Sequence, residues 1–283
     1  LMTGVTNAAT REPAVLATAA ATVQEVSGGR AVLGIGRGDT ALFHLGRKPQ
    51  PVDAFADRVR RLQAYLAGDT VDAAGFPSRL HWLDRAVQPK VPLDVAAAGP
   101  RVIALGAAVA ERVTLAVGAD PERVAWGVDR VRAAAREAGR DGPSLGAYVV
   151  VGCHPDRATA RGLVRGALAA FLHFSAMPGS TGAGVGEGDR AAFAELGARY
   201  DSRRHLMNAA EHSGVVTDEM VDRHAVVGPP EECARRLLEL AGLGLERFVV
   251  TGATLDADRD AARLSGRLLR DEVVPALRAA VPA

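Results

Sequence analysis

Residues 27–39 read Ser27-Gly28-Gly29-Arg30-Ala31-Val32-Leu33-Gly34-Ile35-Gly36-Arg37-Gly38-Asp39. The glycine pair near the start ends a preceding amphipathic helix, because glycine adopts the left-handed helix cap without a steric penalty. The apolar run 31–35 shows no polar alternation, which predicts a strand that is buried on both faces. The glycines at 36 and 38 then end that strand. A helix, a buried strand and a glycine turn in one short stretch indicate an α/β fold.

The same alternation of helix and strand continues outward from this stretch. Strands are predicted over residues 1–7, 31–35, 93–97, 112–117, 145–153 and 248–251. Helices are predicted over 11–26, 52–66, 102–109, 121–138, 155–174, 231–241 and 257–277, with an irregular loop over 68–90. Repeated βα units imply parallel strands with right-handed crossovers. Two architectures fit this order, a doubly wound sheet and a (β/α)8 barrel.

The composition is that of a globular protein. The chain has 283 residues, of which 48% are hydrophobic and 24% charged, and its net charge is +1. Such a balance predicts no nucleic-acid partner, and no apolar run reaches the ~18 residues of a membrane span. The two cysteines, Cys153 and Cys233, are too few for a disulfide scaffold. Because no signal peptide opens the chain, we expect a cytoplasmic protein.

The first residues resemble a core strand rather than the start of a domain. Residue 1 is Leu, and Met2 would open directly into residues 3–7, which resemble the end of a strand. An α/β barrel has eight strands, whereas the pattern predicts six. If the fold is a barrel, we therefore expect that two βα units are missing from the front.

Three strand ends carry residues suited to binding a ligand. In α/β folds ligands bind at the carboxyl ends of strands, which here are residues 3–7, 36–39 and 97–101. In the last segment a helix N-terminus offers unpaired amides and Arg101 adds a cation, a combination that suits a phosphate. The alternative is an ordinary βα turn. The glycines at 34, 36 and 38 depart from the dinucleotide fingerprint, whose third glycine comes one residue later.

Together these segments resemble the bacterial luciferase-like superfamily, and within it the methylenetetrahydromethanopterin reductase-like branch that uses the deazaflavin coenzyme F420. The residues that carry the resemblance are Thr3-Gly4-Val5-Thr6-Asn7, Glu12-Pro13-Ala14-Val15, residues 27–39, Ala97-Ala98-Gly99-Pro100-Arg101 and Val226-Val227-Gly228-Pro229-Pro230-Glu231-Glu232. Two positions depart from the family pattern. Ala8 replaces the usual proline after Thr-Asn, and Ala110-Glu111-Arg112 replaces the usual Ala-Asp-Gly.

The resemblance implies a (β/α)8 TIM barrel, truncated at its N-terminus to about six βα units, with residue 1 at the third strand. It implies a single domain over residues 1–283 with an insertion before the last strand, at about 171–223. It also implies a homodimer. Within that insertion the glycine-rich run 177–190 is expected to form a loop that contributes to substrate selection or to a lid.

The resemblance further implies which residues bind the cofactor. The bulge that backs the tricyclic ring, where relatives often carry a non-proline cis peptide, matches Gly4, Val5, Thr6 and Asn7. The strand mouth beside the polar edge of the ring matches Gly36, Arg37, Gly38 and Asp39. The loop that binds the cofactor phosphate matches Ala97, Ala98, Gly99, Pro100 and Arg101. The next strand mouth, near the cofactor tail or the substrate, matches Val117 and Gly118.

The activity that these matches imply is hydride transfer between coenzyme F420 and a small organic substrate. Asp39 is the candidate for a polar contact at the ring edge or for a proton relay, unless its carboxylate only caps the loop. His44 lies just past that loop and is the histidine expected to face the pocket. The other histidines show no metal-ligand spacing, so no metal is predicted. Two alternatives stay open, an FMN-dependent monooxygenase of the same superfamily and a non-catalytic cofactor-binding relative.

Overall fold

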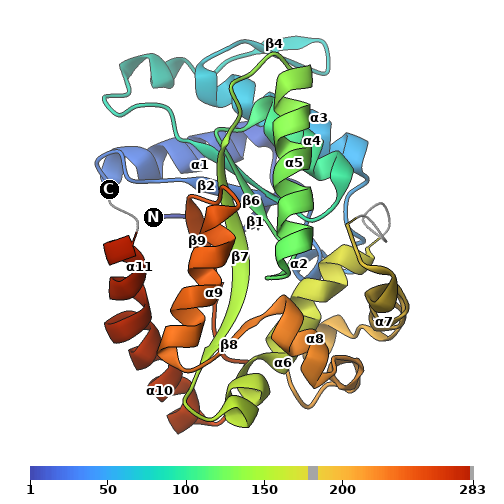
Figure 1. Ribbon diagram of the computed structural model, residues 1–283. Coiled ribbons are helices and arrows are strands. Elements are labelled where there is room, and N and C mark those ends of the chain that lie inside the picture. The colour runs from blue at the N-terminus through green and yellow to red at the C-terminus, as the bar shows by residue number, and fades with distance from the viewer. Residues whose placement is uncertain (178–183, 281–283) are drawn as a thin grey trace. The chain divides into compact units, whose positions relative to one another are not determined.

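The computed structural model describes residues 1–177 and 184–280, which form two compact units. One unit comprises Leu1–Ala97, Arg101–Thr114 and Val131–Ser144, and the other Ala98–Pro100, Leu115–Arg130 and Leu145–Ala283. The elements through which the chain crosses between the units are α4 (Pro100–Val109), β6 (Arg112–Leu115), α5 (Pro121–Glu137) and the start of β7 (Ser144–Cys153). Strands and helices alternate along the chain (Figure 1), which confirms the predicted α/β class.

The first unit contains a parallel sheet with helices after its strands. Its elements are β1 (Thr6–Asn7), α1 (Pro13–Val26), β2 (Leu33–Gly36), α2 (Thr40–Phe43), α3 (Val52–Ala67), β3 (Val71–Ala73), β4 (Phe76–Ser78), the 3-10 helix η1 (His81–Arg85) and β5 (Leu93–Ala97). Strand β2 pairs in parallel with β1 and with β5, and it places Gly34 opposite Asp94. The carboxyl ends of these strands therefore lie along one edge of the sheet.

The helices of this unit follow from local sequence signals. Helix α1 begins at Pro13, where the missing N–H costs nothing in the first turn. Helix α3 carries an apolar face that includes Phe55 and Val59, both fully buried. It ends at Gly68, whose φ of 80° suits the left-handed cap. Helices α1 and α3 pack against each other.

The segment predicted as an irregular loop, residues 68–90, is more ordered than expected. Strands β3 and β4 form an antiparallel hairpin, and η1 follows it. The turn between them is Ala74-Gly75, in which both residues have positive φ, and the Gly75 N–H donates to Asp72 Oδ1 at 2.6 Å. The prediction was wrong because strands of three residues carry too little periodic pattern to be recognised.

Glu111, one of the two departures from the family pattern, ties the start of β6 to β5. Its carboxylate accepts from Lys90 Nζ at 2.7 Å and from the Leu93 N–H at 2.8 Å. Gln63 Nε2 donates to both of its oxygens, at 3.1 and 3.2 Å. Burial alone would raise the pKa of Glu111, but the Lys90 ammonium and these donors outweigh it and hold that pKa below its ordinary value of 4.5.

We expect Glu111→Gln to lower the free energy of unfolding by about 1–2 kcal/mol at pH 7, because a charged acceptor of several donors is lost. The depressed pKa means that this stabilisation is complete above pH 4.5 and is lost as the pH falls through the lower folded value. Urea unfolding should therefore separate variant from wild type at pH 7 and less so towards pH 3. The exposed Glu137→Gln on α5 is the control and should change stability by under about 0.5 kcal/mol. If the difference in unfolding free energy between variant and wild type is the same at pH 3 as at pH 7, this account is wrong.

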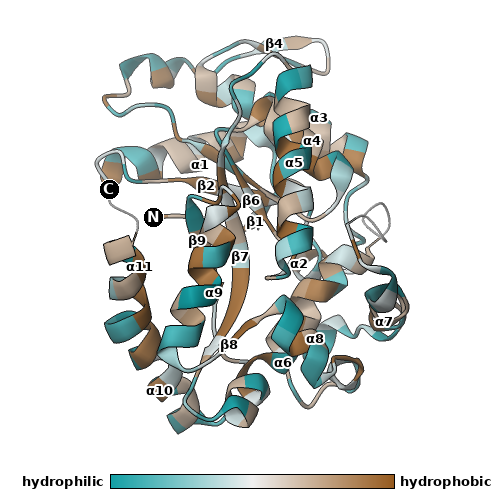
Figure 2. Cartoon of the chain, in the orientation of Figure 1, coloured by the Kyte–Doolittle hydropathy of each residue, from teal (hydrophilic) through white to brown (hydrophobic). Residues whose placement is uncertain are grey.

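The second unit is organised around β7, a ten-residue strand that is buried almost throughout. Its first half pairs in parallel with β9 (Arg247–Thr251), and its last three residues pair in parallel with β8 (Val226–Gly228). The helices that follow β7 are α6 (Arg157–Ala176), α7 (Glu187–Arg199), η2 (Ser202–Arg204), η3 (Glu211–Val215), α8 (Asp218–His224), α9 (Pro230–Gly242), α10 (Arg259–Leu268), the π-helical turn η4 (Leu269–Val273) and α11 (Val274–Ala280). Figure 2 shows the apolar colouring along β7.

The core of this unit forms between β7 and the apolar face of α6. Val150 of β7 packs with Leu163, Leu168 and Leu172 of the helix in one buried cluster. Helix α6 begins at a capping residue, since the Asp156 side chain accepts from the Thr159 N–H. Within the described ranges, none of the helices is both long enough and apolar enough to cross a membrane.

Several expected boundaries differ from the structure. The strand predicted over 112–117 ends at Leu115, because the chain turns there towards α5. Strand β8 was not predicted, since three residues are too short to show a period. Helix α10, η4 and α11 together cover most of the single helix predicted at the C-terminus. Residues 178–183 of the glycine-rich run lie outside the described residues.

Candidate functional site

The turn at residues 4–7 rests directly on strand β2. The Gly4–Val5 peptide bond is cis, which agrees with what the resemblance implied for this position. A Cβ placed on Gly4 would meet nothing within 4 Å, and the Val5 side chain is 43% exposed. Asn7, by contrast, is buried, and its Oδ1 accepts from the N–H groups of Ala9 and Thr10. The turn therefore presents Gly4 and Val5 outward while Asn7 closes the loop behind them.

The glycines of β2 are required by the close approach of this turn. A Cβ on Gly34 would lie 2.1 Å from the Thr3 carbonyl oxygen, and the Thr3 hydroxyl donates to the Gly34 carbonyl at 2.8 Å. A Cβ on Gly36 would lie 3.3 Å from Val5 Cγ2. Gly38 has a φ of 82°, which favours glycine. These contacts, rather than a nucleotide, account for the glycine spacing that resembles a dinucleotide fingerprint.

Asp39 and His44 lie at the two ends of the short helix α2. The Asp39 carbonyl accepts from the Leu42 and Phe43 N–H groups, but its half-buried side chain makes no capping hydrogen bond to the helix. His44 is exposed and contacts the Phe43 ring edge-on, with 5.5 Å between the ring centroids. Its catalytic role stays a prediction.

Two arginines predicted to bind the cofactor lie near each other in the first unit. The half-buried Arg37 donates from Nε to the Gln50 carbonyl at 2.9 Å. Arg101, in the first turn of α4, is exposed and pairs with Asp53. Burial and the Arg101 charge lower the pKa of Arg37, so the two guanidinium groups repel. The one carboxylate recorded here, that of Asp53, pairs with Arg101, so the two cations keep a net positive charge. Arg101 also stands in the first turn of α4, and both features suit a phosphate.

The remaining predicted residues lie at the ends of β5 and β6. Ala97 is buried as the last residue of β5, and Ala98, Gly99 and Pro100 lead into α4. Val117 and Gly118 belong to the second unit, and both are buried. The Val117 carbonyl accepts from Nη1 of Arg123 at 2.9 Å.

A cluster that the sequence did not predict adjoins Gly118. Asp120, Asp189 and His224 place one oxygen or nitrogen each within 4.8 Å of one another, which is close enough for a metal ion. Arg123 and Arg223 already face these two carboxylates and neutralise them, so we interpret the cluster as an internal ion network. Its members are far apart in the sequence, and no spacing motif could have found them. The absence of a metal stays a prediction.

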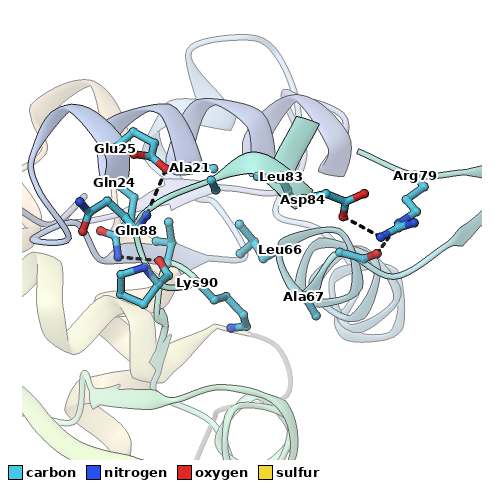
Figure 3. Close-up of a pocket in the computed structure, with 14 residues that line it drawn as sticks. Ala21, Gln24, Glu25, Leu66, Ala67, Arg79, Leu83, Asp84, Gln88 and Lys90 are labelled. Atoms are coloured by element: carbon cyan, nitrogen blue, oxygen red, sulfur yellow. Dashed lines mark hydrogen bonds and ion pairs between the residues drawn. The ribbon is translucent and has the colours of Figure 1, made fainter. Parts of the chain in front are cut away.

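A cavity of about 180 Å³ in the first unit contains none of the predicted site residues (Figure 3). It lies beside the ends of α1 and α3 and just before β5, at the amino end of that strand. Its charged side chains are paired, since Arg79 binds Asp84 at 2.7 Å and Glu25 accepts from the Val87 N–H at 2.6 Å. Ligands in such folds bind at the carboxyl ends of strands, so we do not assign the cofactor to this cavity.

Comparison with known proteins agrees with this arrangement. Residues 1–247 match the family described as luciferase-like monooxygenase. The chain is 29% identical over 267 residues to 5,10-methylenetetrahydromethanopterin reductase of Methanolobus tindarius, covering 93% of this chain and 79% of that protein. It is 28% identical over 285 residues to the same reductase of Archaeoglobus fulgidus, covering 97% and 82%.

A solved structure shows the same fold. An F420-dependent secondary alcohol dehydrogenase, in complex with an F420–acetone adduct, superposes with a TM-score of 0.73 at 19% identity and covers 98% of this chain and 79% of that one. At this identity the likeness concerns the fold alone, and it selects the barrel over the doubly wound sheet. The match over residues 1–247 establishes the assignment: the chain belongs to the luciferase-like monooxygenase family, with an α/β fold of the TIM-barrel type.

Proposed function

We propose that this protein transfers a hydride between coenzyme F420 and a small organic substrate. The observation that carries the proposal is the pair Arg37 and Arg101, two cations that repel each other beside the first turn of α4. An anion bound between them would remove that repulsion, and F420 carries a phosphate. The reductases to which the chain is similar, and the F420-dependent alcohol dehydrogenase that shares its fold, support this cofactor.

The residues of the Gly4–Val5 turn fit a flat ring. The open space above Gly4 and the exposed apolar Val5 offer a surface on which a tricyclic ring can stack. Gly36 keeps the strand behind Val5 free of a side chain. When bound, coenzyme F420 would supply a hydride donor or acceptor at its C5 carbon. The turn would hold one face of the ring and exclude water from it.

Asp39 and His44 are the groups that we propose for proton handling. A carbonyl that accepts a hydride also needs a proton on its oxygen, and a positioned side chain speeds that transfer. The Asp39 carboxylate, half-buried at the start of α2, is the proposed contact at the polar ring edge. His44, at the exposed end of α2, is the proposed exchange point with solvent. The cytoplasmic location, the homodimer and the single-domain organisation stay predictions.

Two titrations of the purified protein test the proposal, one with F420 and one with FMN, both followed by fluorescence. We expect F420 to bind at micromolar concentration or below and FMN to bind more weakly. The reverse preference would identify a flavin-dependent monooxygenase. A folded protein that binds neither would contradict both activities, and one that binds F420 but never accepts or donates a hydride would be a non-catalytic relative.

A further inference from the structure

The carboxyl end of β6 is held by a buried group of charged side chains from distant elements. Arg123 of α5 and His224, the last residue of α8, are each only 1% exposed. Asp189, in the first turn of α7, is 7% exposed. Burying such groups is costly unless they are paired with one another, so their position requires an explanation.

Asp189 fixes the orientation of the His224 ring. His224 Nε2 lies 2.8 Å from Asp189 Oδ2, and Arg223 Nη1 lies 3.1 Å from the same oxygen. A carboxylate can only accept, so Nε2 carries the proton. Burial lowers the pKa of His224, which keeps the ring neutral at pH 7 and leaves Nδ1 as a lone pair. Nδ1 has no hydrogen-bond partner in residues 1–177 and 184–280.

His224 and Arg123 in turn hold three consecutive residues after β6. The Ala119 N–H donates to the His224 carbonyl at 2.8 Å. Gly118 lies against His224, since a Cβ on it would be 3.2 Å from that carbonyl oxygen and 3.6 Å from Nδ1. Arg123 Nη1 donates to the Val117 carbonyl, while its guanidinium lies 5.3 Å from the centre of the Phe193 ring of α7. The strand mouth 117–119 therefore contacts the Arg123 side chain, the His224 carbonyl and one edge of the His224 ring.

We propose that Asp189 is a positioning residue for the cofactor mouth, which acts through His224 on Val117–Ala119. The inference rests on the proposed function, because it takes residues 117 and 118 as part of the cofactor site. It gives α7, in the segment between α6 and β8, a role in cofactor binding without a contact to the cofactor.

A double-mutant cycle on the full chain tests this pathway. Asp189→Ala removes the acceptor, and His224→Phe removes the donor while keeping a flat ring. We expect each change to weaken F420 binding about tenfold, the value of one hydrogen bond to a charged group. The double variant should bind no more weakly than Asp189→Ala alone, because His224→Phe breaks only a connection that Asp189→Ala has already removed. His224→Gln retains a donor and should restore affinity to within about threefold.

Controls separate this proposal from a general loss of structure. Glu187→Ala, an exposed change in the same turn of α7, should leave F420 binding unchanged. Asp189→Leu keeps a similar size without an acceptor, and it replaces Asp189→Ala where that variant does not fold. Single effects that multiply in the double variant would overturn the proposal, and so would wild-type affinity in a folded Asp189→Ala.

A measurement on the ligand-free protein tests the positioning role of Asp189 independently of whether the protein binds F420. In the ligand-free protein, the backbone amide resonances of Val117, Gly118 and Ala119 should shift in the Asp189 variant but not in Glu187→Ala. If wild type does not bind F420, the proposed function fails and this arm still decides the positioning role. Unshifted amides in the Asp189 variant would contradict it.

Discussion

Replacing Arg37 and Arg101 together by glutamine is expected to weaken F420 binding by roughly a hundredfold or more. Each charge-assisted hydrogen bond to a phosphate contributes about 1.5–3 kcal/mol, and both guanidinium groups are proposed to contact it. In the free protein, burial and, to a smaller extent, the charge of Arg101 lower the pKa of Arg37. Because the change also removes the Arg37 hydrogen bond to the Gln50 carbonyl and the exposed Arg101–Asp53 ion pair, urea unfolding is measured beside binding. A loss of affinity in the folded variant is then not due to unfolding.

Fluorescence titration at two salt concentrations measures this effect. Wild-type affinity should fall as salt rises, because screening weakens the attraction between the arginines and the phosphate. The double variant should show a smaller salt dependence. Arg60→Gln on α3 is the control, since it removes the same charge from an exposed position. If the double variant binds F420 as wild type does, the phosphate lies elsewhere.

Gly34→Ala is expected to reduce the free energy of unfolding by about 3 kcal/mol or more, at the upper end of what overpacking costs. The new methyl group would lie 2.1 Å from the Thr3 carbonyl oxygen, so the turn must move away from β2. That movement breaks the Thr3–Gly34 hydrogen bond and displaces Val5. Cofactor binding should be lost together with stability, which urea unfolding and titration measure in parallel.

Two other glycines provide matched controls for this change. Gly4→Ala adds the same methyl group where nothing lies within 4 Å. It should leave unfolding unchanged but weaken F420 binding, because the methyl group faces the proposed ring. Gly162→Ala, in open space on α6, should raise stability by up to about 1 kcal/mol. Normal stability in Gly34→Ala would show that the turn can shift at no cost.

Sequence patterns located the long elements and the residue types at the strand ends. Helix α3 was predicted to within a residue because its apolar residues recur at the helical period, and β7 because its apolar run is long. The hairpin β3–β4 and strand β8 are too short to carry either signal. The family resemblance, rather than periodicity, supplied the site residues and the fold beyond its class.

The sequence alone does not predict which side chains from distant segments contact one another. Arg37 and Arg101 were both candidates, but they come close enough to repel because β2 pairs with β5. Hydrophobic periodicity predicts strands and not the order in which they pair. His224 was one of several scattered histidines, and Asp189 carried no motif. Their contact at 2.8 Å follows from how α7 and α8 pack. Buried ion pairs between distant segments are determined by tertiary structure, and a single sequence does not reveal them.

The pairing of β7 sets an order of events during synthesis. The partners that β7 meets along its first half, in β9, lie about a hundred residues further along the chain. A nascent chain therefore carries the uncharged run Tyr148-Val149-Val150-Val151, of which the first three residues lack their β9 partners until β9 has been made. Uncharged runs of high β-propensity with no proline associate readily while exposed, and closing so long a loop is slow. The yield of folded protein in an expression host thus depends on how well β7 is protected until translation is complete.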